Sequence, residues 1–149
     1  MSLLNKIDED LIKSMKGGDK FKVTVLRGLK SDLKYKRIDK GDDLSEDDAI
    51  AVLSSAAKRR RDSIDQFQKG GRMDLVEQET AELKIIEEYL PEQLSEDKIK
   101  AFIAESIAET GANSPQQMGL VMKSLMPKLK GQADGKLVSK LVNQMLSNS

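Results

Sequence analysis

Glu88-Tyr89-Leu90-Pro91-Glu92-Gln93-Leu94-Ser95 decides how this chain is organised. Proline lacks a backbone N–H and cannot sit inside a helix without breaking it, so Pro91 ends the helix that runs into it. Ser95 precedes a new run of helical periodicity and is typical of a helix cap. We therefore expect an N-terminal four-helix domain over residues 1–90 and a smaller three-helix bundle over residues 91–149. A single continuous bundle with a turn at Pro91 is the alternative.

Before Pro91 the sequence predicts four helices, because apolar residues recur at three- and four-residue spacing between turn and cap residues. The third helix should be the longest, and a serine–aspartate capping pair marks its start. The fourth should open with a similar pair, Asp74 with Glu77. The inward face of the first helix should hold Leu4, Ile7, Leu11 and Met15. The expected limits are Gly17-Gly18 for the end of the first helix, Asp19 to Gly41 for the second, Ser45 to Gly71 for the third and Asp74 to Pro91 for the fourth.

After Pro91 three more helices are expected, which makes the fold class all-α. The fifth helix should run from a cap at Ser95 to a stop at Gly111. Ser114-Pro115 reads as a cap followed by proline at the first helical position, so the sixth helix should continue from there to Pro127. Asp134 should cap the seventh helix.

The composition excludes most enzyme machinery. The 149 residues include no Cys, His or Trp, which removes thiol nucleophiles, imidazole bases and nearly all zinc sites. We therefore predict no catalytic residue, no metal and no cofactor. The first ten residues contain three acids, which is unlike a signal or transit peptide, and no apolar run is long enough to cross a bilayer. The sequence thus predicts a cytoplasmic protein without a membrane partner.

The net charge is zero, with 25 basic and 25 acidic residues, but the charges are unevenly distributed. Four consecutive cations, Lys58, Arg59, Arg60 and Arg61, surround the third helix. They are expected either to pair with acids nearby, such as Asp62 and Asp65 on the same helix, or to contact phosphate or an acidic partner. The acidic block of the fourth helix is expected to face the basic second and third helices. The opposite charges of the two blocks would then form ion pairs within the protein.

The lysines after Thr110 are the better candidates for a polyanion site, since Asp134 is the only acid among them. Gly119, Gly131 and Gly135 would allow close backbone approach, and the helix start at Asp134 would offer amide donors to phosphate. Close helix packing and ordinary turns are the alternative explanation for these glycines. The candidate residues of this region are Lys123, Lys128, Lys130, Lys136, Lys140 and Gly119.

Aromatic side chains are too scarce for a base-stacking platform, since the chain has only two Tyr and three Phe residues. Any RNA would therefore be recognised by its shape and backbone rather than by its bases.

Four motifs in order along the chain resemble the GatB/YqeY family, and the similarity runs from Leu3 to Leu146. The chain looks like a free-standing YqeY-like protein. The motifs are Lys58-Arg59-Arg60-Arg61-Asp62-Ser63-Ile64, Gly71-Arg72-Met73-Asp74-Leu75, the stretch from Glu88 to Ser95, and Met118-Gly119-Leu120-Val121-Met122.

The resemblance implies a two-part helical protein similar to the tail of the B subunit of glutamine-dependent tRNA amidotransferase, a carbon–nitrogen ligase with glutamine as amido-N-donor. That tail is associated with holding tRNA, whereas the chemistry belongs to other domains. The resemblance therefore implies tRNA or structured RNA as the partner, and a role in translation without catalysis by this chain alone. The alternative is a non-enzymatic adaptor that docks on an amidotransferase-related protein partner.

Overall fold

A computed structural model gives the structure of residues 2–148. Within this range the chain forms seven α-helices and two short 3-10 helices, and it contains no strand. The prediction of an all-α fold is confirmed. The elements are α1 (Leu3–Gly17), α2 (Lys20–Lys40), α3 (Glu46–Lys69), α4 (Met73–Glu87), α5 (Glu96–Thr110), η1 (Pro115–Gln117), α6 (Met118–Leu125), η2 (Met126–Leu129) and α7 (Gly135–Ser147).

The helices fall into two compact units, and the division in the chain lies between Pro91 and Glu92. The N-terminal unit contains α1 to α4, and the C-terminal unit contains α5 to α7 with both 3-10 helices. Four helices are followed by three, as predicted. That residues 1–90 and 91–149 are separate domains stays a prediction, for which the Discussion describes a test.

Most helix starts follow the capping residues that the sequence indicated. The side chains of Asp19, Ser45, Ser95 and Asp134 each accept a hydrogen bond from a backbone amide in the first turn of the helix that follows. Such bonds satisfy amides that have no partner inside the helix. Helix ends also agree: α1 is followed by Gly18, whose positive φ of 73° suits a residue without a Cβ.

The start of α3 is held by a reciprocal capping box. The Ser45 hydroxyl accepts the Asp48 amide at 3.0 Å, and the Asp48 carboxylate accepts the Ser45 amide at 3.0 Å. The ammonium of Lys40, 2.6 Å from the same carboxylate, and the Ser45 amide hold the pKa of Asp48 at about 2, below its ordinary 3.8. The ionised carboxylate therefore joins the end of α2 to the start of α3.

Asp48→Asn is expected to make the folding stability depend less on pH in the acid range. A carboxyl group whose pKa is lowered by folding stabilises the fold above its unfolded pKa, and that contribution disappears as the pH falls through the folded pKa. Between about pH 4 and pH 2 the stability of the native protein should therefore fall, and the difference from the variant should close. Urea unfolding at several pH values measures this. Asp65→Asn on the exposed side of α3 is the control, and a difference that persists at pH 2 would contradict the assignment.

The start of α4 differs from the prediction. The helix begins at Met73, and the residue before it, Arg72, supplies no side-chain cap. Asp74 lies inside the first turn, where its two carboxylate oxygens accept hydrogen bonds from the Arg72 guanidinium at 3.1 and 2.9 Å. The predicted capping pair of Asp74 and Glu77 is therefore wrong, because the arginine engages the carboxylate that was expected to cap the backbone.

The sixth helix is shorter than predicted. Residues Pro115–Gln117 form a 3-10 turn, α6 covers Met118–Leu125, and a second 3-10 turn follows at Met126–Leu129. Ser114 makes no side-chain cap bond. Pro127 cannot donate a backbone hydrogen bond, and the chain tightens into 3-10 geometry around it.

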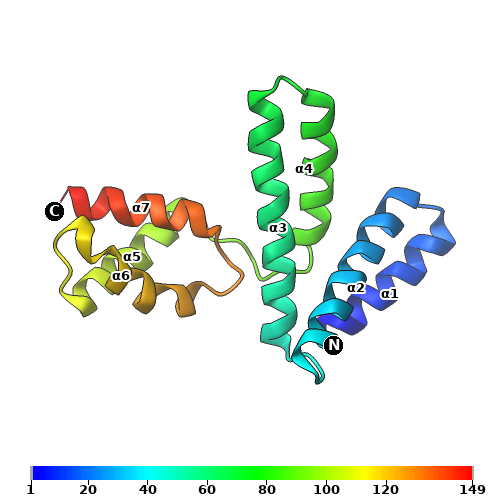
Figure 1. Ribbon diagram of the computed structural model, residues 1–149, viewed down its shortest axis with the longest axis horizontal. Coiled ribbons are helices and arrows are strands. Elements are labelled where there is room, and N and C mark those ends of the chain that lie inside the picture. Colours follow the sequence, from blue (N-terminus) through cyan, green and yellow to red (C-terminus); the bar gives the residue numbers. More distant parts are fainter. Residues whose placement is uncertain (1, 149) are drawn as a thin grey trace. The chain divides into compact units, whose positions relative to one another are not determined.

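The N-terminal unit consists of two antiparallel helix pairs, α1 with α2 and α3 with α4 (Figure 1). Met15, expected on the inward face of α1, is 52% exposed, and Ser14 is buried beside it instead. At the end of the unit the Tyr89 hydroxyl donates to the Asp10 carboxylate at 2.6 Å, and burial followed by this bond raises the pKa of Tyr89. The buried apolar core is formed by Leu3, Ile7, Val25, Leu26, Leu29, Leu33, Ala49, Leu53, Ala56, Ala57, Ile86, Tyr89 and Leu90.

The C-terminal unit has its own apolar core between α5, α6 and α7. The segment that leads into α5 belongs to this unit as well. The Leu94 amide donates to the Gln132 carbonyl at 2.8 Å, and the Gln93 side-chain amide donates to the Gly131 carbonyl at 2.7 Å. The buried core residues are Ile99, Ile103, Ala112, Val121, Leu125, Leu129, Val138, Leu141, Val142 and Leu146.

Candidate nucleic-acid interface

The structure brings only some of the predicted lysines together. Lys136 and Lys140 are exposed and one turn apart, so they share the face of α7 that is turned away from the core. Lys123 is exposed on α6, on the side opposite the buried Val121 and Leu125. Lys130 is exposed directly after η2. The lysines therefore lie on the outer surfaces of separate elements of the C-terminal unit.

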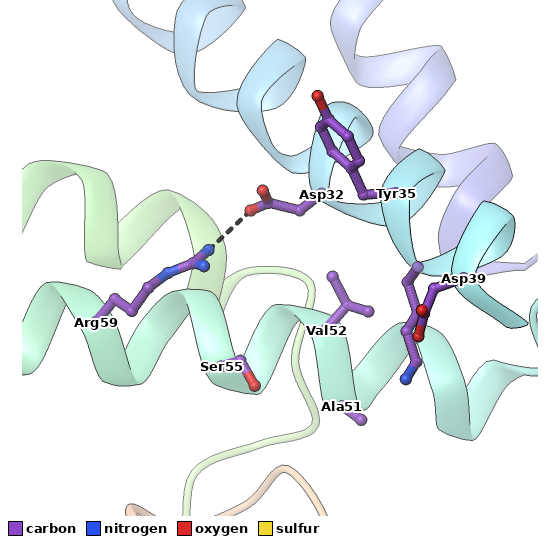
Figure 2. A pocket seen from close by; sticks show the side chains of 8 residues that line it. Asp32, Tyr35, Asp39, Ala51, Val52, Ser55 and Arg59 are labelled. Carbon is purple, nitrogen blue, oxygen red and sulfur yellow. Dashed lines mark hydrogen bonds and ion pairs between the residues drawn. The ribbon is translucent and has the colours of Figure 1, made fainter.

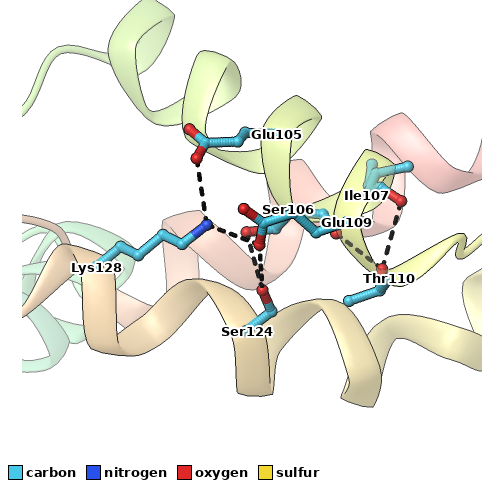
Figure 3. A network of polar contacts seen from close by, with 7 residues as sticks. All are labelled: Glu105, Ser106, Ile107, Glu109, Thr110, Ser124 and Lys128. Atoms are coloured by element: carbon cyan, nitrogen blue, oxygen red, sulfur yellow. Dashed lines mark hydrogen bonds and ion pairs between the residues drawn. The ribbon is translucent and has the colours of Figure 1, made fainter.

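Lys128 points toward α5 and pairs with two exposed glutamates there. Its ammonium lies 3.0 Å from a Glu109 carboxylate oxygen and 3.5 Å from a Glu105 oxygen, and the Ser124 hydroxyl also donates to Glu109 at 3.2 Å (Figure 3). The hydrogen bond from Lys128 lowers the pKa of Glu109, and the same bond raises the pKa of Lys128. One cation is thus shared by two carboxylates, and the contact joins η2 to α5.

Gly119 lies in the first turn of α6 with no positive φ. A Cβ added there would have no neighbour within 4 Å, so close helix packing does not explain this glycine. Gly131 does adopt a positive φ of 68°, which explains its place in the turn before α7. At the start of α7, the Asp134 carboxylate already accepts the Lys136 amide at 3.3 Å. A phosphate approaching this helix end would meet that negative charge.

The Arg59–Arg61 part of the basic cluster on α3 is engaged by neighbouring helices. Arg59 lies 2.9 Å from Asp32 of α2, and Arg61 lies 3.5 Å from Glu87 of α4. The pair of Arg61 with Glu87 agrees with the prediction that the acidic fourth helix faces the basic helices, whereas Arg59 pairs with an acid of α2. Lys58 is exposed, and among residues 2–148 no ion pair of its side chain is seen. An RNA-binding role for the cluster stays a prediction.

Arg60 is the most enclosed member of that cluster. Its Nε lies 3.9 Å from Glu79 and 3.8 Å from Glu82, and the three side chains are only 23%, 21% and 17% exposed. The buried Nε finds no hydrogen-bond acceptor among the residues that the structure describes. Burial, followed by the nearby Glu79 carboxylate, raises the pKa of Glu82. The acidic fourth helix was expected to face the basic helices, but the sequence did not indicate that Glu79 and Glu82, which are 19 and 22 positions from Arg60, would enclose this one arginine.

A groove that the sequence did not predict runs between α2 and α3. It encloses about 400 Å³, with Ala51, Val52 and Ser55 of α3 on one wall. The Arg59–Asp32 ion pair closes one end, and Tyr35 stands on α2 with its ring turned away from α3 (Figure 2).

Over residues 2–148 the structure contains no group of acidic residues suited to a metal ion and no helix able to span a membrane.

Several of the relatives that comparison with known proteins finds share one name. The chain is 38% identical over 112 residues to altered inheritance of mitochondria protein 41, mitochondrial, of Lachancea thermotolerans, and this match covers 73% of the chain and 60% of the relative. The protein of the same name from Kluyveromyces lactis is 35% identical over 113 residues, with 73% and 60% covered. That of Clavispora lusitaniae is 32% identical over 128 residues, with 83% and 74% covered.

These relatives correct one prediction. The chain spans about 60% of the length of the first two, and all three are named as mitochondrial proteins. The cytoplasmic location that we predicted from the first ten residues is contradicted by those names. The model of the YqeY-like protein family matches residues 4–146, nearly the whole chain, and this confirms the resemblance seen in the four motifs. The chain therefore belongs to the YqeY-like protein family.

Proposed function

We propose that this protein binds tRNA or another structured RNA through the backbone phosphates, using the C-terminal unit. The observation that carries the proposal is the set of exposed lysines on the outer surfaces of α6 and α7 and after η2. After Thr110 the chain holds five lysines and one acid, and among these lysines Lys128 is turned toward carboxylates of α5. Lysine ammonium groups are suited to phosphate contacts, which position an RNA without reading its sequence.

Recognition by backbone shape suits the aromatic content of this unit. Phe102 is the only aromatic residue after Pro91, and it packs against the core of the unit. The unit therefore lacks the exposed aromatic side chains on which unpaired bases would stack. The chain's resemblance to the tail of the amidotransferase B subunit makes tRNA the RNA to test first, and amide-transfer chemistry is not part of this proposal.

Lys136→Glu combined with Lys140→Glu is expected to weaken tRNA binding roughly tenfold and to reduce the salt slope by about 2, because each lysine would neutralise one phosphate. Filter binding of tRNA across a salt series measures both. The fold should survive, because both side chains are exposed and Lys136, in the first turn of α7, lies where an acid is favoured.

Lys98→Glu with Lys100→Glu changes the charge of the same unit by the same amount on α5, and this control should leave the affinity within about twofold. Equal effects of the two double variants would show only a response to net charge. If the native protein gave no salt-dependent binding, the RNA proposal would fail. The adaptor function, with an amidotransferase-related protein as partner, would then take its place, since zero net charge is unusual for an RNA-binding protein.

A further inference from the structure

The side of α2 that faces away from the core is an uncovered stripe. Its members recur at spacings of four, three, four and three residues, which keeps them on one helix face. Two of them are large apolar side chains with high exposure, Tyr35 at 72% and Ile38 at 67%. The α2 stripe consists of Thr24, Gly28, Ser31, Tyr35 and Ile38, all exposed.

The middle of the α2 stripe is shaped for close approach by another helix. Gly28 lies inside α2, where glycine is less favourable than alanine, and a Cβ added to it would meet nothing within 4 Å. No contact within the N-terminal unit therefore requires a glycine there. Thr24 and Ser31, on either side, are also small. A second helix could approach the backbone closely at Gly28 and pack against Tyr35 and Ile38 further along.

Opposite charges border the two edges of the α2 stripe. Arg27 and Lys34 follow one edge, and Asp32 and Asp39 follow the other. If Gly28 and Tyr35 are a positions of a heptad, and Ser31 and Ile38 are d positions, the cations occupy g and the acids occupy e. Each acid comes five residues after a cation, which is the offset that joins g of one helix to e of the next in a parallel pair.

The charges in this heptad register are complementary to those of a second, identical α2 helix. In a parallel pair of identical helices, Lys34 of each copy would face Asp39 of the other, and Arg27 would face Asp32. In an antiparallel pair the like-charged edges would meet and repel. Asp32 already forms an ion pair with Arg59 of its own chain at 2.9 Å. The interchain pair of Lys34 with Asp39 is therefore the main feature that favours the parallel orientation.

We propose that the α2 stripe is a self-association surface, on which a second copy of this chain packs its own α2 in parallel orientation. The contact area is small, because the stripe has only two large apolar side chains. The dimer should therefore be weak and reversible, with a Kd on the order of 10 to 500 µM. The proposal concerns the N-terminal unit and is independent of RNA binding by the C-terminal unit.

Charge-swapped variants test both the partner and its orientation. Lys34→Glu places acid opposite acid in the homodimer, and Asp39→Lys places lysine opposite lysine, so each variant alone should dimerise at least about tenfold more weakly. An equimolar mixture should recover native affinity, because the glutamate introduced in one variant meets the lysine introduced in the other. Sedimentation equilibrium up to about 1 mM protein measures this. A monomeric native protein, or a mixture no tighter than the single variants, would overturn the proposal.

The apolar part of the surface has a matched control. Ile38→Asp should abolish the dimer without unfolding the chain, since the side chain is 67% exposed. Ile12→Asp makes the same exchange on α1 at a side chain that is 53% exposed, and it should leave the dimer unchanged. Equal effects of the two substitutions would assign association to general surface hydrophobicity instead of the α2 stripe.

Discussion

Ile103→Ala is expected to destabilise the C-terminal unit strongly while the N-terminal unit keeps its stability. Ile103 is fully buried in the core between α5, α6 and α7, and truncation of a buried isoleucine costs about 2–5 kcal/mol. A unit of this size is stable by roughly 3–9 kcal/mol, so one substitution removes a large part of its stability. The melting temperature of this unit should fall by roughly 10–25 °C.

Thermal unfolding followed by circular dichroism, with NMR signals assigned to each unit, measures the effect of Ile103→Ala. Ile12→Ala is the matched control, because this isoleucine is 53% exposed on α1 and its truncation should move the melting temperature little. The experiment also tests the domain division predicted from Pro91. If both units lost structure in one transition, the division into separately folding domains would be wrong.

Arg60→Met is expected to destabilise the N-terminal unit by about 2 kcal/mol at pH 7. Removing one partner from a buried ion pair costs about 3–5 kcal/mol, and the remaining exposure of Arg60, Glu79 and Glu82 reduces that figure. The two glutamates would be left close together without a cation. Because burial and Glu79 already raise the pKa of Glu82, the carboxyl group takes up a proton more readily in the folded protein than in the unfolded chain.

The cost of Arg60→Met should therefore shrink as the pH falls, since a protonated Glu82 needs no counter-ion. A group with a raised folded pKa favours the fold below its unfolded pKa, and this advantage is lost as the pH rises through the folded pKa. Urea unfolding between pH 7 and pH 4 gives the comparison. Arg59→Met removes an exposed pair from the adjacent position, and it should cost below about 1 kcal/mol at either pH. If the destabilisation by Arg60→Met did not change with pH, it would come from lost packing and not from the loss of a counter-ion for Glu82.

Local chemistry made the helices predictable. Ser45 and Ser95 cap the helices that follow them, and Gly18 and Gly111 lie at helix ends in the left-handed region, because these roles depend on residues within one turn. One prediction failed because a residue nearby competed for the same group. At α4, Arg72 takes the Asp74 carboxylate, and a capping rule that reads only positions and residue types does not weigh such a competitor.

The candidate site was less predictable, since it depends on distant pairs. Lys128 has no acid near it in the sequence, yet it lies against Glu105 and Glu109 of α5. The four-residue spacing of these glutamates on one helix face was a signal for a cation site that could have been used. The groove between α2 and α3 and the enclosed Arg60 group depend on how helices pack, which no local pattern specifies.

The bond between the Leu94 amide and the Gln132 carbonyl decides where this chain can be shortened. A fragment that began at the cap residue Ser95 would keep every helix of the C-terminal unit. It would nevertheless lose the non-helical residues that tie the entry of α5 to the turn before α7. Residues 92–94 thus belong to the folded body of the C-terminal unit, and a truncated protein that is meant to keep this body intact should begin no later than Glu92.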